Sequence, residues 1–182
     1  MNAARSIPVA CFLSIFIMSA VADGGYAAAA GAESSVARRH IVSTNPILDL
    51  FTWYNAEYEF RLAPTSTIGM NGSFISIGDD DEDYKSISGF YRYYPQGAAP
   101  AGFFFGGRLG VYDVNNKDDD GKKKSATFYG FGIDIGYTWL LGDTRRFALS
   151  LGIGAVRLFG GDLEDIAATL PTVRLVNVGI AF

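Results

Sequence analysis

Strict alternation of side chains constrains the fold of this chain more than any other feature of its sequence. Residues 54–62 read YNAEYEFRL, in which Tyr, Ala, Tyr, Phe and Leu alternate with Asn, Glu, Glu and Arg. A period of two places successive side chains on opposite faces of an extended strand, whereas a helix would mix them around its surface. The stretch therefore predicts a β-strand with one apolar and one polar face.

The same alternation recurs along the chain and predicts an all-β protein. Large aromatic and aliphatic residues occupy one face of each run, and Gly, Ser, Ala, Thr or a lone charge occupies the other. A soluble sandwich would carry large polar groups on its wet face, whereas a narrow barrel in lipid directs bulk outward and keeps small residues in its lumen. The expected strands are residues 39–50, 54–62, 65–77, 84–94, 103–112, 128–139, 147–155 and 172–182.

The connectors predict the strand number and the direction of each strand. Outer-membrane barrels have an even number of strands, short periplasmic turns and longer external loops. Charged connectors alternate here with less charged ones, so the APTS turn at residues 63–66 is assigned to the periplasmic side. A strand must then precede residues 54–62, and residues 39–50 fill that place, although Pro46 requires an irregularity in the ladder. The prediction is an eight-stranded antiparallel transmembrane up-and-down barrel over residues 39–182.

The first 32 residues are typical of a secretory signal peptide. Arg5 precedes an apolar run at residues 7–22, and small residues follow it, so cleavage is expected between about residues 22 and 32. An uncleaved anchor helix is the alternative, although the run is short for a membrane span. Residues 33–38 would link the signal to the barrel. Cys11, the single cysteine, lies in this segment, so the mature chain would have no thiol.

Four short motifs follow one another along the predicted barrel. They are Thr44-Asn45-Pro46, Glu59 in the next strand, Arg92-Tyr93-Tyr94-Pro95, and Gly136-Tyr137-Thr138-Trp139. Their order and spacing resemble those of small outer-membrane barrels of Gram-negative bacteria, and more narrowly a widespread family of barrels classed as a domain of unknown function. The resemblance covers about residues 40–182. It implies the fold and an outer-membrane location, but no activity.

Six charged residues fall on the inward face of the predicted strands. An isolated charge in a narrow lumen is costly, so these groups must pair or keep water. One interpretation is a network of salt bridges that plugs the lumen, and the other is a gated conduit for protons, water or small ions. An eight-stranded barrel is just wide enough for side chains to fill it, which favours the plug. The six residues are Glu57, Glu59, Arg61, Arg92, Arg108 and Asp134.

Neither catalysis nor metal binding is indicated by the sequence. Some eight-stranded outer-membrane barrels modify lipid A with a histidine, a serine and a carboxylate, but the single histidine here, His40, lies at the expected periplasmic start of the first strand. The acidic runs at residues 79–83 and 117–121 lack the spaced ligands of a calcium loop. They are expected in solvated external loops, where divalent cations could bridge them weakly to lipopolysaccharide. No catalytic residue, metal ligand or cofactor is assigned.

Two groups of apolar residues indicate a membrane location. The first is an interfacial set of aromatic residues at predicted strand ends, whose rings suit the headgroup level of a bilayer. The second is the alternate residues of the final VNVGIAF, which resemble the C-terminal signature that the barrel-assembly machinery recognises. The interfacial set is Tyr91, Tyr93, Tyr94, Tyr137 and Trp139, and the assembly signal is Val176, Val178, Ile180 and Phe182.

These observations lead to one functional hypothesis and two alternatives. The net charge of −4 offers no basic face for a nucleic acid. We expect a monomeric, non-enzymatic outer-membrane protein with a structural, envelope-integrity or surface-interaction role, in contact with outer-membrane lipids and lipopolysaccharide. The first alternative is a narrow channel or transporter for small or hydrophobic solutes. The second is a lipid A-modifying enzyme.

Overall fold

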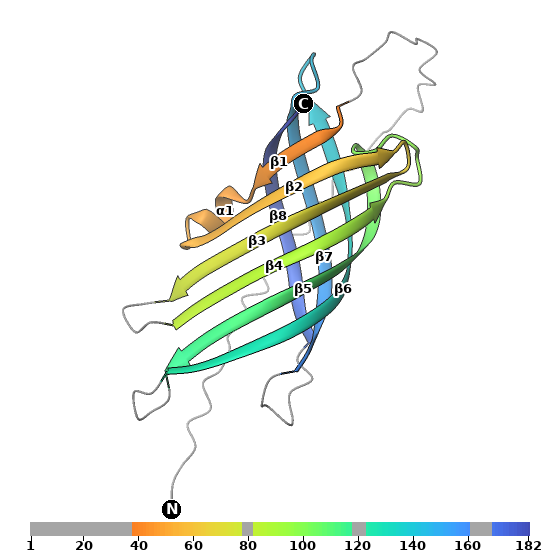
Figure 1. Ribbon diagram of the computed structural model, residues 1–182. Helices are drawn as coiled ribbons and strands as arrows, with labels where there is room; N and C mark the ends of the chain where they lie inside the picture. The colour runs from red at the N-terminus through yellow and green to blue at the C-terminus, as the bar shows by residue number, and fades with distance from the viewer. Residues whose placement is uncertain (1–37, 78–81, 118–122, 161–168) are drawn as a thin grey trace, which may run out of the picture. The chain divides into compact units, whose positions relative to one another are not determined.

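A computed structural model describes residues 38–77, 82–117, 123–160 and 169–182 (Figure 1). The predicted signal peptide and most of the two acidic runs lie outside these residues. Within the described part of the chain, no helix is long and apolar enough to cross a membrane. The elements are β1 (His40–Thr44), α1 (Pro46–Asp49), β2 (Trp53–Ala63), β3 (Ser66–Ile77), β4 (Glu82–Tyr93), β5 (Gly102–Lys117), β6 (Lys123–Leu141), β7 (Phe147–Phe159) and β8 (Thr169–Ala181).

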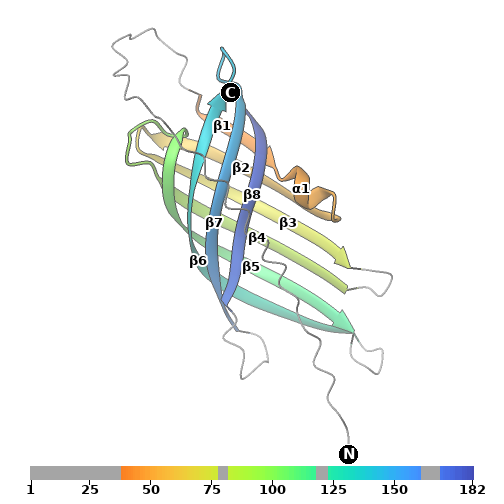
Figure 2. The ribbon, with the colours of Figure 1, turned by 180° about the vertical axis from the view of Figure 1, so that it is seen from behind.

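The strands form a closed antiparallel barrel in which each strand pairs with its neighbours in sequence. The barrel closes between β1 and β8, where Ile41 pairs with Ala181 and Thr44 with Val178. Strands β2 to β5 face the viewer in Figure 1, and β6 to β8 do so in the reverse view of Figure 2. The predicted eight-stranded, antiparallel, up-and-down topology is confirmed.

The first predicted strand is too long, because the chain changes conformation at Asn45. The strand β1 ends at Thr44, and Pro46 begins the short helix α1 instead of forming a bulge. The Asn45 side chain caps this helix by accepting hydrogen bonds from the backbone N–H groups of Ile47 and Leu48, at 3.1 and 3.2 Å. Proline is well placed in the first turn of a helix, where its missing N–H removes no hydrogen bond.

The outer surface of the barrel is apolar. Strand pairing aligns Tyr58, Met70, Leu109 and Phe131 in one row, and each of these side chains is exposed. Further exposed aliphatic and aromatic residues lie on every strand, whereas buried Ser, Thr, Asn, Glu, Asp and Arg face the interior. This distribution is the inverse of a soluble barrel and is the one expected when hydrocarbon replaces water as the surrounding solvent.

Large side chains also enter the interior, where the sequence indicated mainly small ones. The backbone passes close to three of these rings, those of Phe90, Phe104 and Tyr112, because glycine occupies the facing positions. A Cβ on Gly69 would meet the Phe90 ring, and a Cβ on Gly136 would lie 2.6 Å from the Phe104 ring. The inward glycines therefore make room for rings that fill the lumen. The buried interior aromatic residues are Phe90, Tyr94, Phe104, Tyr112 and Phe128.

Two apolar layers close the interior on either side of a polar middle. One layer comprises Tyr94, Ala99 and Phe104. It lies at the end of the barrel that holds the C-terminus, where the 94–101 loop is held by a hydrogen bond from the Ala99 N–H to the Pro64 carbonyl, at 2.8 Å. The other layer comprises Tyr112 of β5, Phe128 of β6, and Val156 and Leu158 of β7, further from that end of the barrel. The charged residues of the interior lie between these layers.

The contrast between inward and outward glycines gives a first prediction. Gly69→Ala should lower the free energy of unfolding by about 1–3 kcal/mol, because the new methyl group meets the Phe90 ring and the Tyr58 carbonyl. Gly89→Ala is the matched control, because its Cβ would have its nearest neighbour at 3.8 Å. Urea titration of the folded barrel in detergent, followed by the gel shift between folded and boiled samples, measures both. Equal destabilisation by the two substitutions would contradict this account.

Candidate functional site

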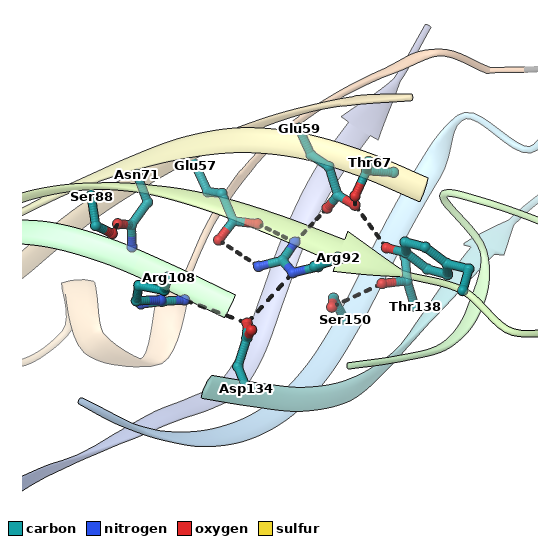
Figure 3. Close-up of polar contacts among 11 residues, drawn as sticks. Glu57, Glu59, Thr67, Asn71, Ser88, Arg92, Arg108, Asp134, Thr138 and Ser150 are labelled. Carbon is teal, nitrogen blue, oxygen red and sulfur yellow. Dashed lines mark hydrogen bonds and ion pairs between the residues drawn. The ribbon is translucent and has the colours of Figure 1, made fainter. Parts of the chain in front are cut away.

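A cluster of five charged side chains occupies the middle of the barrel interior (Figure 3). Strand β2 contributes Glu57 and Glu59, and strands β4, β5 and β6 contribute Arg92, Arg108 and Asp134. Alternation along each strand directs these side chains inward, because their neighbours in sequence point outward. Arg92 is fully buried, and Glu57, Glu59 and Asp134 retain at most 6% of their exposure. We call this set the interior charge network.

Arg92 lies at the centre of the interior charge network. Its Nη1 donates to Glu57 Oε1 at 3.0 Å and to Glu59 Oε2 at 2.5 Å, and its Nη2 donates to Glu57 Oε2 at 3.2 Å. The pair with Glu57 is therefore bidentate, the arrangement that matches a planar guanidinium to a carboxylate. These bonds join β4 to β2 over the intervening strand β3.

Two hydroxyl groups complete the coordination of Glu59. Thr67 Oγ1 and the Tyr94 hydroxyl both donate to Glu59 Oε1, at 2.6 and 2.7 Å. A buried carboxylate is stable only when its lone pairs are occupied by donors. Glu59 meets this requirement with one guanidinium and two hydroxyls.

Asp134 connects Arg92 to Arg108 on the other side of the network. Its Oδ2 lies 3.5 Å from Arg92 Nε and 3.5 Å from Arg108 Nη2. Strand pairing places Arg92 opposite Gly106 and Gly106 opposite Asp134. A Cβ on Gly106 would lie 2.9 Å from Asp134 Oδ1 and 3.0 Å from Arg92 Cγ, so glycine permits this approach.

The guanidinium of Arg92 is also enclosed by aromatic rings. Its Cζ lies 3.9 Å from the centroid of the Phe90 ring and 4.7 Å from that of Phe104. A cation over an aromatic face is attracted by the ring quadrupole, and the attraction is greatest where water is excluded. Carboxylates at the edge and rings on the faces together replace the hydration that Arg92 loses on burial.

Smaller polar contacts extend the network along the interior. Ser88 donates to Asn71, and Thr138 and Ser150 lie within hydrogen-bonding distance at 3.1 Å. Among the described residues, no group of three or more His, Cys, Asp and Glu side chains is arranged to hold a metal ion. The arrangement is suited to joining strands across the lumen and filling it, and its carboxylates are engaged with guanidinium and hydroxyl donors.

The structure brings together five of the six charged residues predicted for the lumen. Arg61 is not part of the cluster. It lies near the end of β2, beside a register shift between Arg61 and Ala63, and its Nε is 3.4 Å from the Ala63 carbonyl. Thr67, Phe90 and Phe104 are partners of the network that the sequence pattern did not predict. Phe90 and Phe104 share the inward register of Arg92 and Arg108, which is the signal that could have identified them.

The interfacial prediction is wrong for Tyr94. This side chain is fully buried in the lumen, because it has the same inward register as Arg92 and because the 94–101 loop follows it at this end of the barrel. Tyr91, Tyr93, Tyr137 and Trp139 are exposed on the outer surface near the same end of the barrel. The rings of Tyr137 and Trp139 lie 4.5 Å apart.

The residues predicted as an assembly signal lie on β8 and just beyond it. Val178, Ile180 and Phe182 are exposed on the outer surface, and Val176 is partly exposed. The Phe182 ring stacks on His40, with centroids 5.3 Å apart and planes 10° from parallel. His40 Nδ1 also lies 2.7 Å from the Tyr58 hydroxyl. The described contacts of His40 thus join it to aromatic side chains at the rim.

The closed ring of eight strands, the apolar exterior and the charged interior define a small β-barrel of the outer-membrane type. A family model described as "Protein of unknown function (DUF3575)" matches residues 24–160, and the chain belongs to this family. The match agrees with the resemblance that the four sequence motifs indicate.

A comparison with solved structures finds a match at low sequence identity. The crystal structure of the N-terminal β-barrel domain of Pseudomonas aeruginosa OprF is similar to this chain with a TM-score of 0.48 and 14% identity. The similarity covers 80% of this chain and 98% of that domain. No curated protein matches the sequence.

The charge network predicts a large effect of removing its central cation. Arg92→Met should destabilise the barrel by about 3–5 kcal/mol, because it leaves buried carboxylates without their partner. Adding Glu57→Gln and Glu59→Gln should recover a substantial part of that loss, because the uncompensated charges are removed. The free energy of unfolding in detergent micelles measures both effects.

A charge-matched control separates this effect from a general change of net charge. Lys85→Met removes one cation from a side chain that is 55% exposed and should change stability by less than about 1 kcal/mol. An Arg92→Met variant as stable as the Lys85→Met variant would show that the network does not support the barrel.

Proposed function

We propose that this protein is an outer-membrane barrel with a closed interior, and that its role is structural, in the integrity of the envelope or in surface interaction. In this proposal the barrel is non-enzymatic, and its rim that holds the C-terminus lies at the periplasmic side. The apolar exterior supports the membrane location, because such a surface would be unfavourable in water over so many neighbouring strands.

The burial of Arg92 is the observation that best supports a closed interior. Its guanidinium, fully buried, bonds to Glu57 and Glu59 on one side and pairs with Asp134 on the other. The network thereby spans the lumen from β2 to β6. The Phe104 and Tyr112 layers lie on either side of it. A hydrated ion would have to displace both rings and charge pairs to pass.

The closed interior predicts that the protein does not conduct ions. Full-length wild-type protein inserted into planar bilayers should show no steady conductance above that of the lipid. Proton flux into dye-loaded vesicles should likewise equal that of protein-free vesicles. Insertion is verified independently by the mobility difference between unheated and boiled samples. Steady conductance or proton flux that Arg92→Met or Glu57→Gln abolishes would instead support the alternative of a narrow channel.

We further propose that the outward side chains at the end of β8 are recognised during barrel assembly. Phe182 contributes backbone hydrogen bonds to closure, including one from its N–H to the His40 carbonyl at 2.9 Å, while its ring remains 56% exposed. A substitution of the ring can therefore separate recognition from closure.

Phe182→Ala should reduce the amount of barrel in the outer membrane severalfold while changing the stability of the folded barrel little. The backbone bonds persist in this variant, and the loss is limited to a half-exposed ring and its stacking contact with His40. Phe147→Ala is the matched control, because Phe147 is a 62% exposed aromatic residue that pairs with Ile180 at the same rim. Fractionated membranes measure the amount, and urea titration of refolded protein measures stability. Equal membrane levels of the two variants would contradict the proposal.

A further inference from the structure

Arginine side chains gather on one arc of the rim that holds the C-terminus. Arg38 and Arg39 precede β1, and Arg145 and Arg146 lie in the turn between β6 and β7. Arg39, Arg145 and Arg146 are exposed and Arg38 is partly exposed. The single carboxylate among the described residues of the turn is that of Asp143. We call the four arginines the arginine arc.

Backbone hydrogen bonds join the parts of the arginine arc into one continuous edge. The Arg39 N–H donates to the Phe182 carbonyl at 3.1 Å, and the Ala181 N–H donates to the Arg146 carbonyl at 2.7 Å. Arg38 reaches across to the turn, where its Nη2 donates to the Thr144 carbonyl at 2.9 Å. The segments before β1 and after β6 thus lie together although about a hundred residues separate them, and Figure 1 shows that turn beside the C-terminus.

The remainder of the same rim carries no comparable charge. The connection between β2 and β3 is Pro64 and Thr65, and the loop at residues 94–101 reads YPQGAAPA. Neither contains a charged side chain. Arg61, near the end of β2, adjoins the arc, since its backbone N–H donates to the Arg39 carbonyl at 2.8 Å. The described arginines of this rim therefore gather on the side of β7, β8, β1 and β2, and the connections of β3, β4 and β5 carry none. The high density of positive charge is therefore a property of the arc and not of the whole rim.

Exposed rings lie directly beside the arginine arc on the outer surface. Phe147 follows the turn and is 62% exposed, and Phe182 is 56% exposed and stacks on His40. Aromatic rings at a barrel rim mark the level of the lipid headgroups. The arginines of the arc lie at this same rim, where an exposed guanidinium can reach a headgroup and donate in a bidentate manner to its phosphate.

We infer that the arginine arc is a binding surface for anionic phospholipid headgroups in the leaflet that surrounds this rim. The inference rests on the proposed membrane location and adds to it a ligand class and the residues that bind it. The selected lipid carries a net negative headgroup, such as phosphatidylglycerol, and a zwitterionic lipid of the same chain length is excluded from the same positions. The arc orients one side of the barrel toward such lipids, because the opposite side of the rim is uncharged.

The test measures lipid selectivity of the full-length protein in vesicles. Spin-labelled phosphatidylglycerol and spin-labelled phosphatidylcholine are compared at the protein boundary, and the ratio of their association constants is determined. The wild type should prefer phosphatidylglycerol, and Arg39→Gln/Arg146→Gln should reduce the ratio by up to about fivefold for each arginine removed. High salt should reduce the wild-type preference as well, because it screens exposed charges.

A matched double variant identifies the surface. Lys85→Gln/Arg157→Gln removes two exposed cations outside the arc, and its lipid selectivity should equal that of the wild type. Equal selectivity in the wild type and the arc variant, or an equal loss in the control, would overturn the inference while leaving the membrane barrel intact. Failure of the wild type to insert into vesicles would overturn the proposed location and this inference together.

Discussion

The ion pairing of Arg92 is the interaction on which the rest of the structure depends. A guanidinium without water is tolerated only if carboxylates and polarisable rings replace its hydration. Here carboxylates from β2 and β6 approach its edge, and the rings of Phe90 and Phe104 approach its faces. Since these groups come from strands on both sides of β4, satisfying one charge fixes the curvature and register of half the barrel.

That arrangement explains why glycine is so frequent on the inward face. Gly69 lies beside Phe90, Gly106 between Arg92 and Asp134, and Gly136 beside Phe104. A narrow barrel has no space for large side chains on two neighbouring inward positions, so a large inward side chain fits where the facing residue on the next strand is glycine. Large side chains can occupy the outer face, because no other strand faces them there. The apolar exterior and the filled interior are two results of one packing constraint.

The alternating pattern was sufficient to predict the fold, the strand order and most of the inward charges. Period two assigns each side chain to a face, and loop parity assigns the strand number. It could not identify the partners of Arg92, because contacts across β3 and β5 depend on register and on the space that Gly106 leaves. It also misplaced Tyr94, because a ring at a strand end suits a girdle and a lumen equally well, and only the tertiary position of the 94–101 loop decides between them.

At Pro46 the observed structure differs from the predicted strand because of a local interaction, the capping of a short helix by Asn45. Loop parity extended the predicted first strand past it to residue 50, but the Asn45 cap offers the backbone N–H groups a better arrangement than a ladder interrupted by proline.

Side-chain hydrogen bonds compensate for an excess of negative charge inside the barrel. Among the described residues, the interior charge network holds three carboxylates and two guanidiniums. The excess negative charge falls where hydroxyl donors are available, since Thr67 and Tyr94 both donate to Glu59. Tyr94 therefore serves two requirements at once, because its hydroxyl satisfies a buried carboxylate while its ring closes the end of the lumen.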